Sequence, residues 1–241
     1  MRTSKKICAS ILCLVLVAGC ASSGGTTDQT TVIAPSTTLS STSISPTSSR
    51  FVAEIWADNW FSLWINGTKV GEDSVPITTE RSFNSESIRF EADYPLTVAI
   101  VSKDFIENDS GLEYIGQPKQ QIGDGGFIAQ ITDLATGKVV LTTSAQWRGL
   151  VVHTAPLNPE CESSGSPAVD CRHEIVGEPD NWQSADFDTS TWAPATEYSE
   201  AEVGTKDGYN DINWDQRARL IWGSDLKLQN TILWRAPTVK P

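Results

Sequence analysis

Residues 53–71 read AEIWADNWFSLWINGTKVG, and this stretch decides the fold class. Apolar-rich segments flank the dipeptide Asn66-Gly67. Such a dipeptide is typical of a type I′ hairpin turn, because both central residues must adopt positive φ angles, which Asn and Gly tolerate best. The stretch therefore predicts two β-strands joined by a tight turn.

Short apolar runs separated by turn signals continue through the rest of the chain, without the period of an amphipathic helix. Residues 126–143, GFIAQITDLATGKVVLTT, predict a second hairpin that turns at residues 135–137. Strands are expected at Phe51–Trp56, Phe61–Ile65, Ser87–Glu91, Leu96–Ser102, Gly126–Asp133, Lys138–Thr143, Leu150–His153, Arg219–Trp222 and Thr231–Arg235. Many short strands at fairly regular spacing indicate an all-β protein, an antiparallel β-sandwich or jelly roll.

The N-terminus has the pattern of an export signal. Three basic residues, Arg2, Lys5 and Lys6, precede an apolar run from Ile7 to Ala18. This run is shorter than the roughly 20 residues that a membrane-spanning helix needs, so we expect a signal peptide over residues 1–19.

The sequence Val17-Ala18-Gly19-Cys20 resembles the lipobox of bacterial lipoproteins. This resemblance implies cleavage before Cys20, a diacylglycerol on its sulfur and an acyl chain such as palmitate on its amine. Ala21, rather than an acidic residue, then favours the outer membrane as the location within the cell envelope. An ordinary secretory signal with an unmodified Cys20 is the alternative.

Composition divides the mature chain into a linker and a folded part. Residues 20–50 are almost entirely Ser, Thr, Gly and Pro after the lipidated cysteine, and such a segment cannot bury enough apolar surface to fold. Residues 51–241 are expected to form the β-sandwich, as one domain or two.

The net charge limits the classes of binding partner, and the cysteine content bears on disulfide formation outside the cytoplasm. Removing the signal leaves 15 basic against 30 acidic residues, a net charge of −15, which argues against nucleic-acid partners. Beyond Cys20, the mature chain contains only Cys161 and Cys171. In an exported protein, two cysteines at this short spacing predict a disulfide.

Three segments resemble galactose-binding-like jelly-roll modules, such as those attached to bacterial rhamnosidases and other glycosidases. Residues 57–71 are similar to their "A-D-D-x-aromatic-x-L-x-V-N-G-x-x-V-G" hairpin, and residues 182–195, WQSADFDTSTWAPA, to their "W-x-x-x-x-F-D-D-S-x-W-x-x-A" segment. Residues 219–239 resemble their closing strands. The resemblance implies a galactose-binding-like fold, often with a structural Ca²⁺ ion.

Tryptophan suggests where a carbohydrate could bind, because sugars pack their apolar face on an aromatic ring. Spacing places Trp56, Trp60 and Trp64 on one face of a strand-like stretch, with Trp56 and Trp64 expected in the core. Trp192, Trp222 and Trp234 are expected to be structural. The candidate ligand residues are Trp60 with its neighbours Asp58 and Asn59, and Trp147, Trp182 and Trp214 in polar, turn-rich segments.

Residues 207–215, DGYNDINWD, are rich in oxygen ligands of the kind that Ca²⁺ prefers. The segment lacks the glycine and the final glutamate of an EF-hand loop. Its candidate metal ligands are Asp207, Asp211, Asn213 and Asp215, and a solvated acidic loop is the alternative. Asp104, Asn108 and Asp109 form a weaker acidic group.

No hydrolase, zinc-protease or phosphate-binding motif supports catalysis. The sequence therefore predicts a membrane-anchored lipoprotein that binds carbohydrate or a cell-surface glycan through a non-catalytic β-sandwich. Two alternatives remain open, a structural or adhesive surface lipoprotein that binds a protein partner and a small glycan hydrolase.

Overall fold

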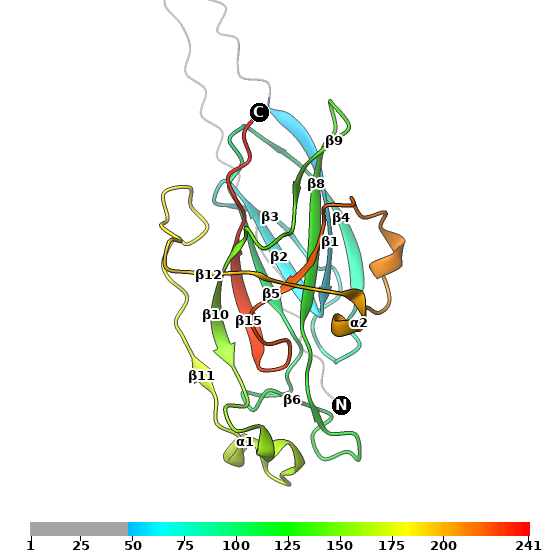
Figure 1. Ribbon diagram of the computed structural model, residues 1–241, viewed down its shortest axis with the longest axis vertical. Helices are drawn as coiled ribbons and strands as arrows, with labels where there is room; N and C mark the ends of the chain where they lie inside the picture. Colours follow the sequence, from blue (N-terminus) through cyan, green and yellow to red (C-terminus); the bar gives the residue numbers. More distant parts are fainter. Residues whose placement is uncertain (1–47) are drawn as a thin grey trace, which may run out of the picture. The chain divides into compact units, whose positions relative to one another are not determined.

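A computed structural model describes residues 48–241 and shows a β-sandwich of two large antiparallel sheets (Figure 1). This arrangement confirms the predicted all-β class. The expected signal peptide, the lipidated Cys20 and residues 20–47 of the expected linker lie outside the described residues. The first strand begins at Ser49, two residues before the expected start of the folded part.

The first sheet has the strand order β13-β14-β8-β1-β4, and β9 also pairs with β8. Strand β1 lies between β4 and β8 over nearly its whole length. The strands of this sheet are β1 (Ser49–Asp58), β4 (Asn84–Ala92), β8 (Gly126–Asp133), β9 (Lys138–Thr142), β13 (Thr196–Tyr198) and β14 (Leu220–Trp222).

The second sheet has the order β11-β10-β15-β5-β2-β3, and β12 also pairs with β10. Its strands are β2 (Trp60–Ile65), β3 (Thr68–Glu72), β5 (Val98–Lys103), β10 (Arg148–Thr154), β11 (Glu174–Ile175), β12 (Ala193–Pro194) and β15 (Gln229–Arg235). Each of the nine runs expected from the sequence overlaps a strand of one of these two sheets.

A small third sheet pairs β6 (Leu112–Glu113) with β7 (Gln121–Ile122) at the lower end of the molecule in Figure 1. The helical segments are short: η1 (Pro159–Ser163), α1 (Pro167–Asp170), α2 (Glu200–Val203) and η2 (Tyr209–Asp211). Within residues 48–241, no helix is long and apolar enough to cross a membrane.

The main core lies between the two large sheets. Period-two alternation places Phe51, Ala53 and Ile55 of β1 against Phe61 and Leu63 of β2, and all five are fully buried. Part of each outer face is covered as well, because Trp56 packs with α2 and η2 residues on one side, and Trp182 and Trp192 pack on the other. The expected structural residues Trp192, Trp222 and Trp234 are all buried.

The opening stretch contains three strands rather than the expected two. The Asn66-Gly67 turn joins β2 to β3 as predicted, with φ angles of 50° and 79°. Strand β1 belongs to the other sheet, however, because the chain crosses between the sheets at Asp58 and Asn59. The expectation that Trp56 shares a face with Trp60 and Trp64 is therefore wrong. Trp64, expected in the core, is half-buried beside Trp60 on the outer face of the second sheet.

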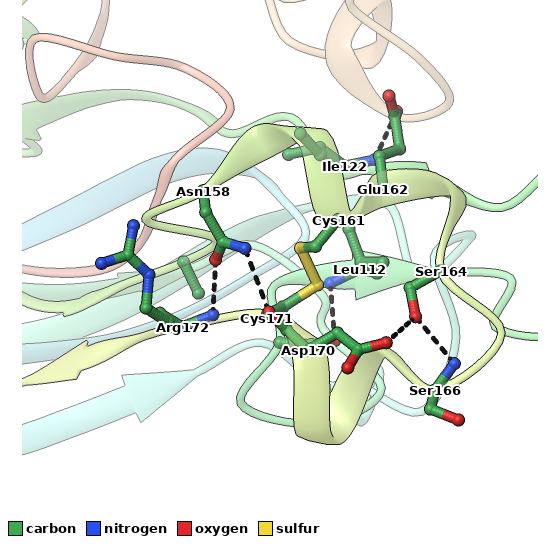
Figure 2. Close-up of a disulfide and its surroundings, with 12 residues drawn as sticks. Leu112, Ile122, Asn158, Cys161, Glu162, Ser164, Ser166, Asp170, Cys171 and Arg172 are labelled. Carbon is green, nitrogen blue, oxygen red and sulfur yellow. Dashed lines mark hydrogen bonds between the residues drawn. A yellow bond between two sulfur atoms is a disulfide. The ribbon is translucent and has the colours of Figure 1, made fainter.

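The predicted disulfide between Cys161 and Cys171 is confirmed (Figure 2). It closes a compact segment, residues 158–172, that contains η1 and α1. We call this segment the disulfide knob. In Figure 1 it lies at the lower end of the molecule, beside the β6–β7 hairpin.

Candidate functional site

One end of the sandwich carries a concentration of acidic residues. Strand β1 ends at Asp58, β5 ends one residue before Asp104, and Asp124 precedes β8 by two residues. Because Asp58 pairs with Gly126, the end of β1 and the start of β8 meet at the same edge of the sheet. These three carboxyl groups therefore converge from strands that lie far apart in the sequence.

Asn59 fixes the chain crossing at this end. Its backbone N–H donates to the carbonyl of Lys103 at 2.7 Å, and its side-chain oxygen accepts from the N–H of Phe105 at 2.6 Å. Its side-chain nitrogen donates to the carbonyl of Glu80 at 3.2 Å. Asn59 is only 1% exposed, so it holds three segments together and offers no atom to a ligand.

A polar pocket of about 580 Å³ opens above the acidic residues. Its walls combine charged groups of both signs with two aromatic rings. Four segments supply the lining, which consists of Glu80, Arg81, Phe83, Glu113, Tyr114, Lys119, Gln121, Asp124, Lys206 and Asp207.

Lys206 forms part of the pocket wall and neutralises part of the acidic charge. Its ammonium lies 2.9 Å from an oxygen of Asp58 and 3.1 Å from an oxygen of Asp124. It also lies 4.5 Å from the ring centroid of Phe83. Burial alone would lower the pKa of Lys206, but the attraction of the two carboxylates outweighs it and raises that pKa. Lys206 therefore stays positively charged and is held in position by two carboxyl groups.

Asp104 is the most unusual carboxyl group of the cluster. It is 3% exposed, and neither of its oxygens has a hydrogen-bond partner. The backbone of Gly123 approaches so closely that a Cβ at that position would lie 2.4 Å from the Oδ2 atom. Burial, reinforced by the charges of Asp58 and Glu113, raises the pKa of Asp104 well above its usual value.

Asp58 and Glu113 also hold their protons more tightly than exposed carboxyls do. Burial raises the pKa of Asp58 to about 8, although the Lys206 ammonium opposes this shift. Burial likewise raises the pKa of Glu113 to about 7, opposed by a hydrogen bond that Gln121 donates at 3.0 Å. The site thus contains carboxyl groups poised near neutrality beside an ammonium group.

The structure brings only two of the predicted site residues to this pocket. Asp58 lies beneath it through its contact with Lys206, and Asp207 lines it. Trp60 is half-buried and packs on the outer face of the second sheet, where the Lys103 ammonium lies 5.4 Å from its ring centroid. Trp60 therefore does not contribute to the pocket lining.

The other tryptophans named as ligand candidates contribute to the interior. Trp147 and Trp182 are at most 1% exposed, so neither ring presents a face to solvent. Trp214 is half-buried against Tyr209, to whose carbonyl its indole N–H donates at 3.0 Å. All three rings are accounted for by packing.

The candidate calcium ligands of residues 207–215 are dispersed. Both oxygens of Asp215 accept hydrogen bonds from the Arg217 guanidinium, at 2.8 and 2.9 Å. Asp211 and Asn213 are exposed, and Asp207 lies in the pocket wall. In the part of the chain that the structure describes, no three His, Cys, Asp or Glu side chains are placed to hold a metal ion. Calcium binding stays a prediction.

Sequence reasoning named only Asp207 of the ten lining residues and missed the titratable groups Glu113, Asp124 and Lys206. A signal for Asp124 was available, because the GDGG sequence at 123–126 leads directly into a buried strand. Asp104 likewise follows a buried strand at once. Polar residues at strand ends are natural site candidates. The strand that ends at Glu113 is too short to recognise, however, and Lys206 lies between α2 and η2.

Comparison of the chain with protein-family models, with curated proteins and with solved structures finds no match. The geometry of the pocket is therefore the main basis for a functional assignment.

Proposed function

We propose that the pocket binds a neutral carbohydrate, such as a cell-surface glycan, without turning it over. The protein that carries it would be exported and anchored to the cell envelope, at the outer membrane, through a lipidated Cys20. The single observation that carries the proposal is the lining of the pocket, which combines donors, acceptors and aromatic rings in one open cavity.

The charges of the lining favour a ligand without net charge. Three cationic side chains, Arg81, Lys119 and Lys206, face three anionic ones, Glu80, Asp124 and Asp207. Glu113 adds a carboxyl group whose pKa of about 7 lets it donate or accept a hydrogen bond near neutral pH. A polyhydroxylated ligand can both donate to the carboxylates and accept from the cations.

Two aromatic rings supply the apolar part of the recognition. Tyr114 and Phe83 line the pocket, and each has an ammonium group over its face, that of Lys119 at 3.3 Å and that of Lys206 at 4.5 Å. Lys119 is exposed, so its side chain can leave the Tyr114 ring when a sugar packs there. The ring of Tyr114 is therefore the expected stacking surface.

A glycan array followed by isothermal titration tests the proposal. The mature chain is used with Cys20→Ala, so that no lipid is attached. Arg81→Ala removes a charged donor from the pocket wall, and we expect about tenfold weaker binding, equivalent to about 1.4 kcal/mol. Arg89→Ala, at an exposed position of β4 outside this pocket, is the matched control and should bind as the wild type does. Absence of binding to any glycan would favour a protein partner instead.

Glycan hydrolysis is the second candidate, and one observation favours it. Glu113, with its pKa raised to about 7, shares the pocket with Asp124, which is paired with Lys206. Glycosidic-bond cleavage uses a pair of carboxyl groups in one cleft, of which one has a raised pKa and serves as the general acid. Release of reducing ends from a bound glycan, abolished by Glu113→Gln without loss of binding, would select this candidate.

A further inference from the structure

The β6–β7 hairpin supplies four of the ten lining residues of the pocket, Glu113, Tyr114, Lys119 and Gln121. Only two residue pairs join its strands, Leu112 with Ile122 and Glu113 with Gln121, and it belongs to neither large sheet. An isolated two-stranded hairpin is marginally stable in water. The position of these four side chains must therefore depend on what the hairpin packs against.

The disulfide knob is that support. Leu112 is fully buried against Cys161 and Cys171, and Ile115 and Ile122 pack against the same cluster. Figure 2 shows Leu112 and Ile122 beside the disulfide. The apolar side of the hairpin thus rests on the sulfur bridge itself.

Gln120 connects the tip of the hairpin to the knob. Its side-chain nitrogen donates to the carbonyls of Glu162 and Ser164, at 2.6 and 2.9 Å. Its side-chain oxygen accepts from the N–H of Gly116 at 2.8 Å, which closes the tip. Glu162 also accepts a hydrogen bond from the N–H of Ile122 at 3.1 Å (Figure 2).

The knob owes its own shape to cross-links, because its two helical segments are only five and four residues long. The Asn158 side chain donates to the carbonyl of Asp170 at 3.0 Å and accepts from the N–H of Arg172 at 2.7 Å. The hydroxyl of Ser164 donates to the Asp170 carboxylate. With the disulfide, these bonds tie the two ends of the knob together (Figure 2).

We propose that the Cys161–Cys171 disulfide and the Gln120 side chain hold the β6–β7 hairpin in place. They thereby position the four lining residues that this hairpin supplies to the ligand pocket. Removing either one loosens the hairpin and weakens ligand binding while the two large sheets stay folded. This inference rests on the proposed function of the pocket for its ligand, but the position of the hairpin can be measured without a ligand.

Gln120→Ala is the sharper variant, because the Gln120 side chain lies outside the pocket lining and outside the core of the sandwich. Gln117→Ala is its matched control, since Gln117 is an exposed residue of the same hairpin tip whose side chain takes no part in these bonds. The disulfide is tested by Cys161→Ala/Cys171→Ala, which leaves no free thiol in the knob. All variants are made in the mature chain.

The first readout is titration of the Glu113 carboxyl group, followed by NMR with ¹³C-labelled glutamate. The pKa of Glu113 is raised to about 7 because the group is buried, so a loosened hairpin lowers it. We expect a downward shift of about one unit or more in Gln120→Ala and in the double cysteine variant, and no shift in Gln117→Ala. Faster amide exchange at Leu112 and Ile122, with unchanged exchange in β1 and β5, should accompany it.

The second readout is ligand affinity, which we expect to fall about tenfold in Gln120→Ala for a sugar that the wild type binds. Should no sugar bind the wild type, the proposed function fails, whereas the Glu113 titration still decides the positioning role. An unchanged Glu113 pKa and unchanged hairpin exchange in Gln120→Ala would overturn the inference. Because Gln120→Ala retains the disulfide, its titration tests the positioning role even if the double cysteine variant does not fold.

Discussion

The ammonium of Lys206 lies 2.9 Å from a carboxylate oxygen of Asp58, although the two residues are 148 positions apart in the chain. Asp58 is 1% exposed, whereas about a third of the Lys206 side chain reaches solvent. This ion pair joins the floor of the pocket to its wall. The same ammonium contacts Asp124, so one positive charge offsets part of the negative charge at the acidic end of the sandwich.

Replacing Lys206 should make stability depend more strongly on pH. In Lys206→Met, Asp58 loses the cation that favours its ionised form, so its pKa rises further. We expect a loss of about 1–2 kcal/mol at pH 8, where Asp58 ionises in the wild type, and a smaller loss at pH 5. Urea unfolding at the two pH values measures the difference.

Lys69→Met is the control for this experiment. Its ion pair with Glu72 is also short, at 2.8 Å, but both side chains are nearly half exposed. Exposed pairs contribute at most about 1 kcal/mol, and this loss should not differ between the two pH values. Equal losses for the two lysine variants at pH 8 would show that the buried pair has no special role.

The acidic cluster predicts that the protein becomes less stable from about pH 4.5 to pH 8. Asp58, Asp104 and Glu113 have folded pKa values above their unfolded values, so the folded state binds more protons in this window. Stability therefore falls as pH rises through the folded pKa values. Chemical unfolding across this range checks the sign, and a stability that rises with pH would contradict the account.

Asp104→Asn should remove part of this dependence. The variant does not titrate, so the free-energy cost of keeping this buried group protonated above its unfolded pKa disappears. We expect it to gain on the order of 1 kcal/mol relative to wild type at pH 8, with little change at pH 5. Glu91→Gln, at an exposed position of β4, should leave the slope unchanged.

Trp182 should prove to be a stability residue rather than a ligand residue. Its ring is 1% exposed and lies between Trp64 and Trp192, with centroid distances of 5.7 and 6.0 Å. Trp182→Ala should cost about 3–5 kcal/mol in unfolding free energy. Trp60→Ala, at a half-buried position, should cost clearly less. Urea unfolding of both variants compares them, and a Trp182→Ala protein of wild-type stability would contradict the burial of this ring.

At the Asn66-Gly67 turn, the backbone conformation and the side chain of Asn66 should contribute separately to the free energy of unfolding. Asn66 has a φ of 50°, and its side chain donates to the carbonyl of Asp93 and accepts from the N–H of Thr97. Asn66→Gly keeps the backbone conformation but loses both bonds, at a cost of about 1–2 kcal/mol. Asn66→Ala should cost about 1 kcal/mol more, because Ala resists positive φ. Thermal and urea unfolding of the pair test this order, which a more stable Asn66→Ala would reverse.

Sequence reasoning succeeded where the information is local. The nine strand-like runs and the Asn66-Gly67 turn depend on neighbouring residues, and all appear in the structure. The disulfide follows from the short spacing of two cysteines, Cys161 and Cys171. Each of these features can be recognised from a short stretch of sequence, and the widest is the separation of 10 between the two cysteines.

Features that depend on the path of the chain could not be predicted. Trp56 and Trp60 look like one face of one strand, but the crossing at Asp58 places them in different sheets. The pocket joins Glu80, Glu113, Asp124 and Lys206, and only the tertiary packing of loops, hairpin and strands brings their segments together. The two-residue strands β6 and β7 are too short to leave a periodic signal.

The central proposal is that a carbohydrate binds in the pocket and not at Trp60 and Trp64 on the outer face of the second sheet. The most direct measurement is a ¹H–¹⁵N NMR titration of the mature chain with a glycan panel. It should shift the amides of residues 113–124, while the indole signals of Trp60 and Trp64 stay in place. Shifts confined to those two indoles, or no shift with any glycan, would contradict the account.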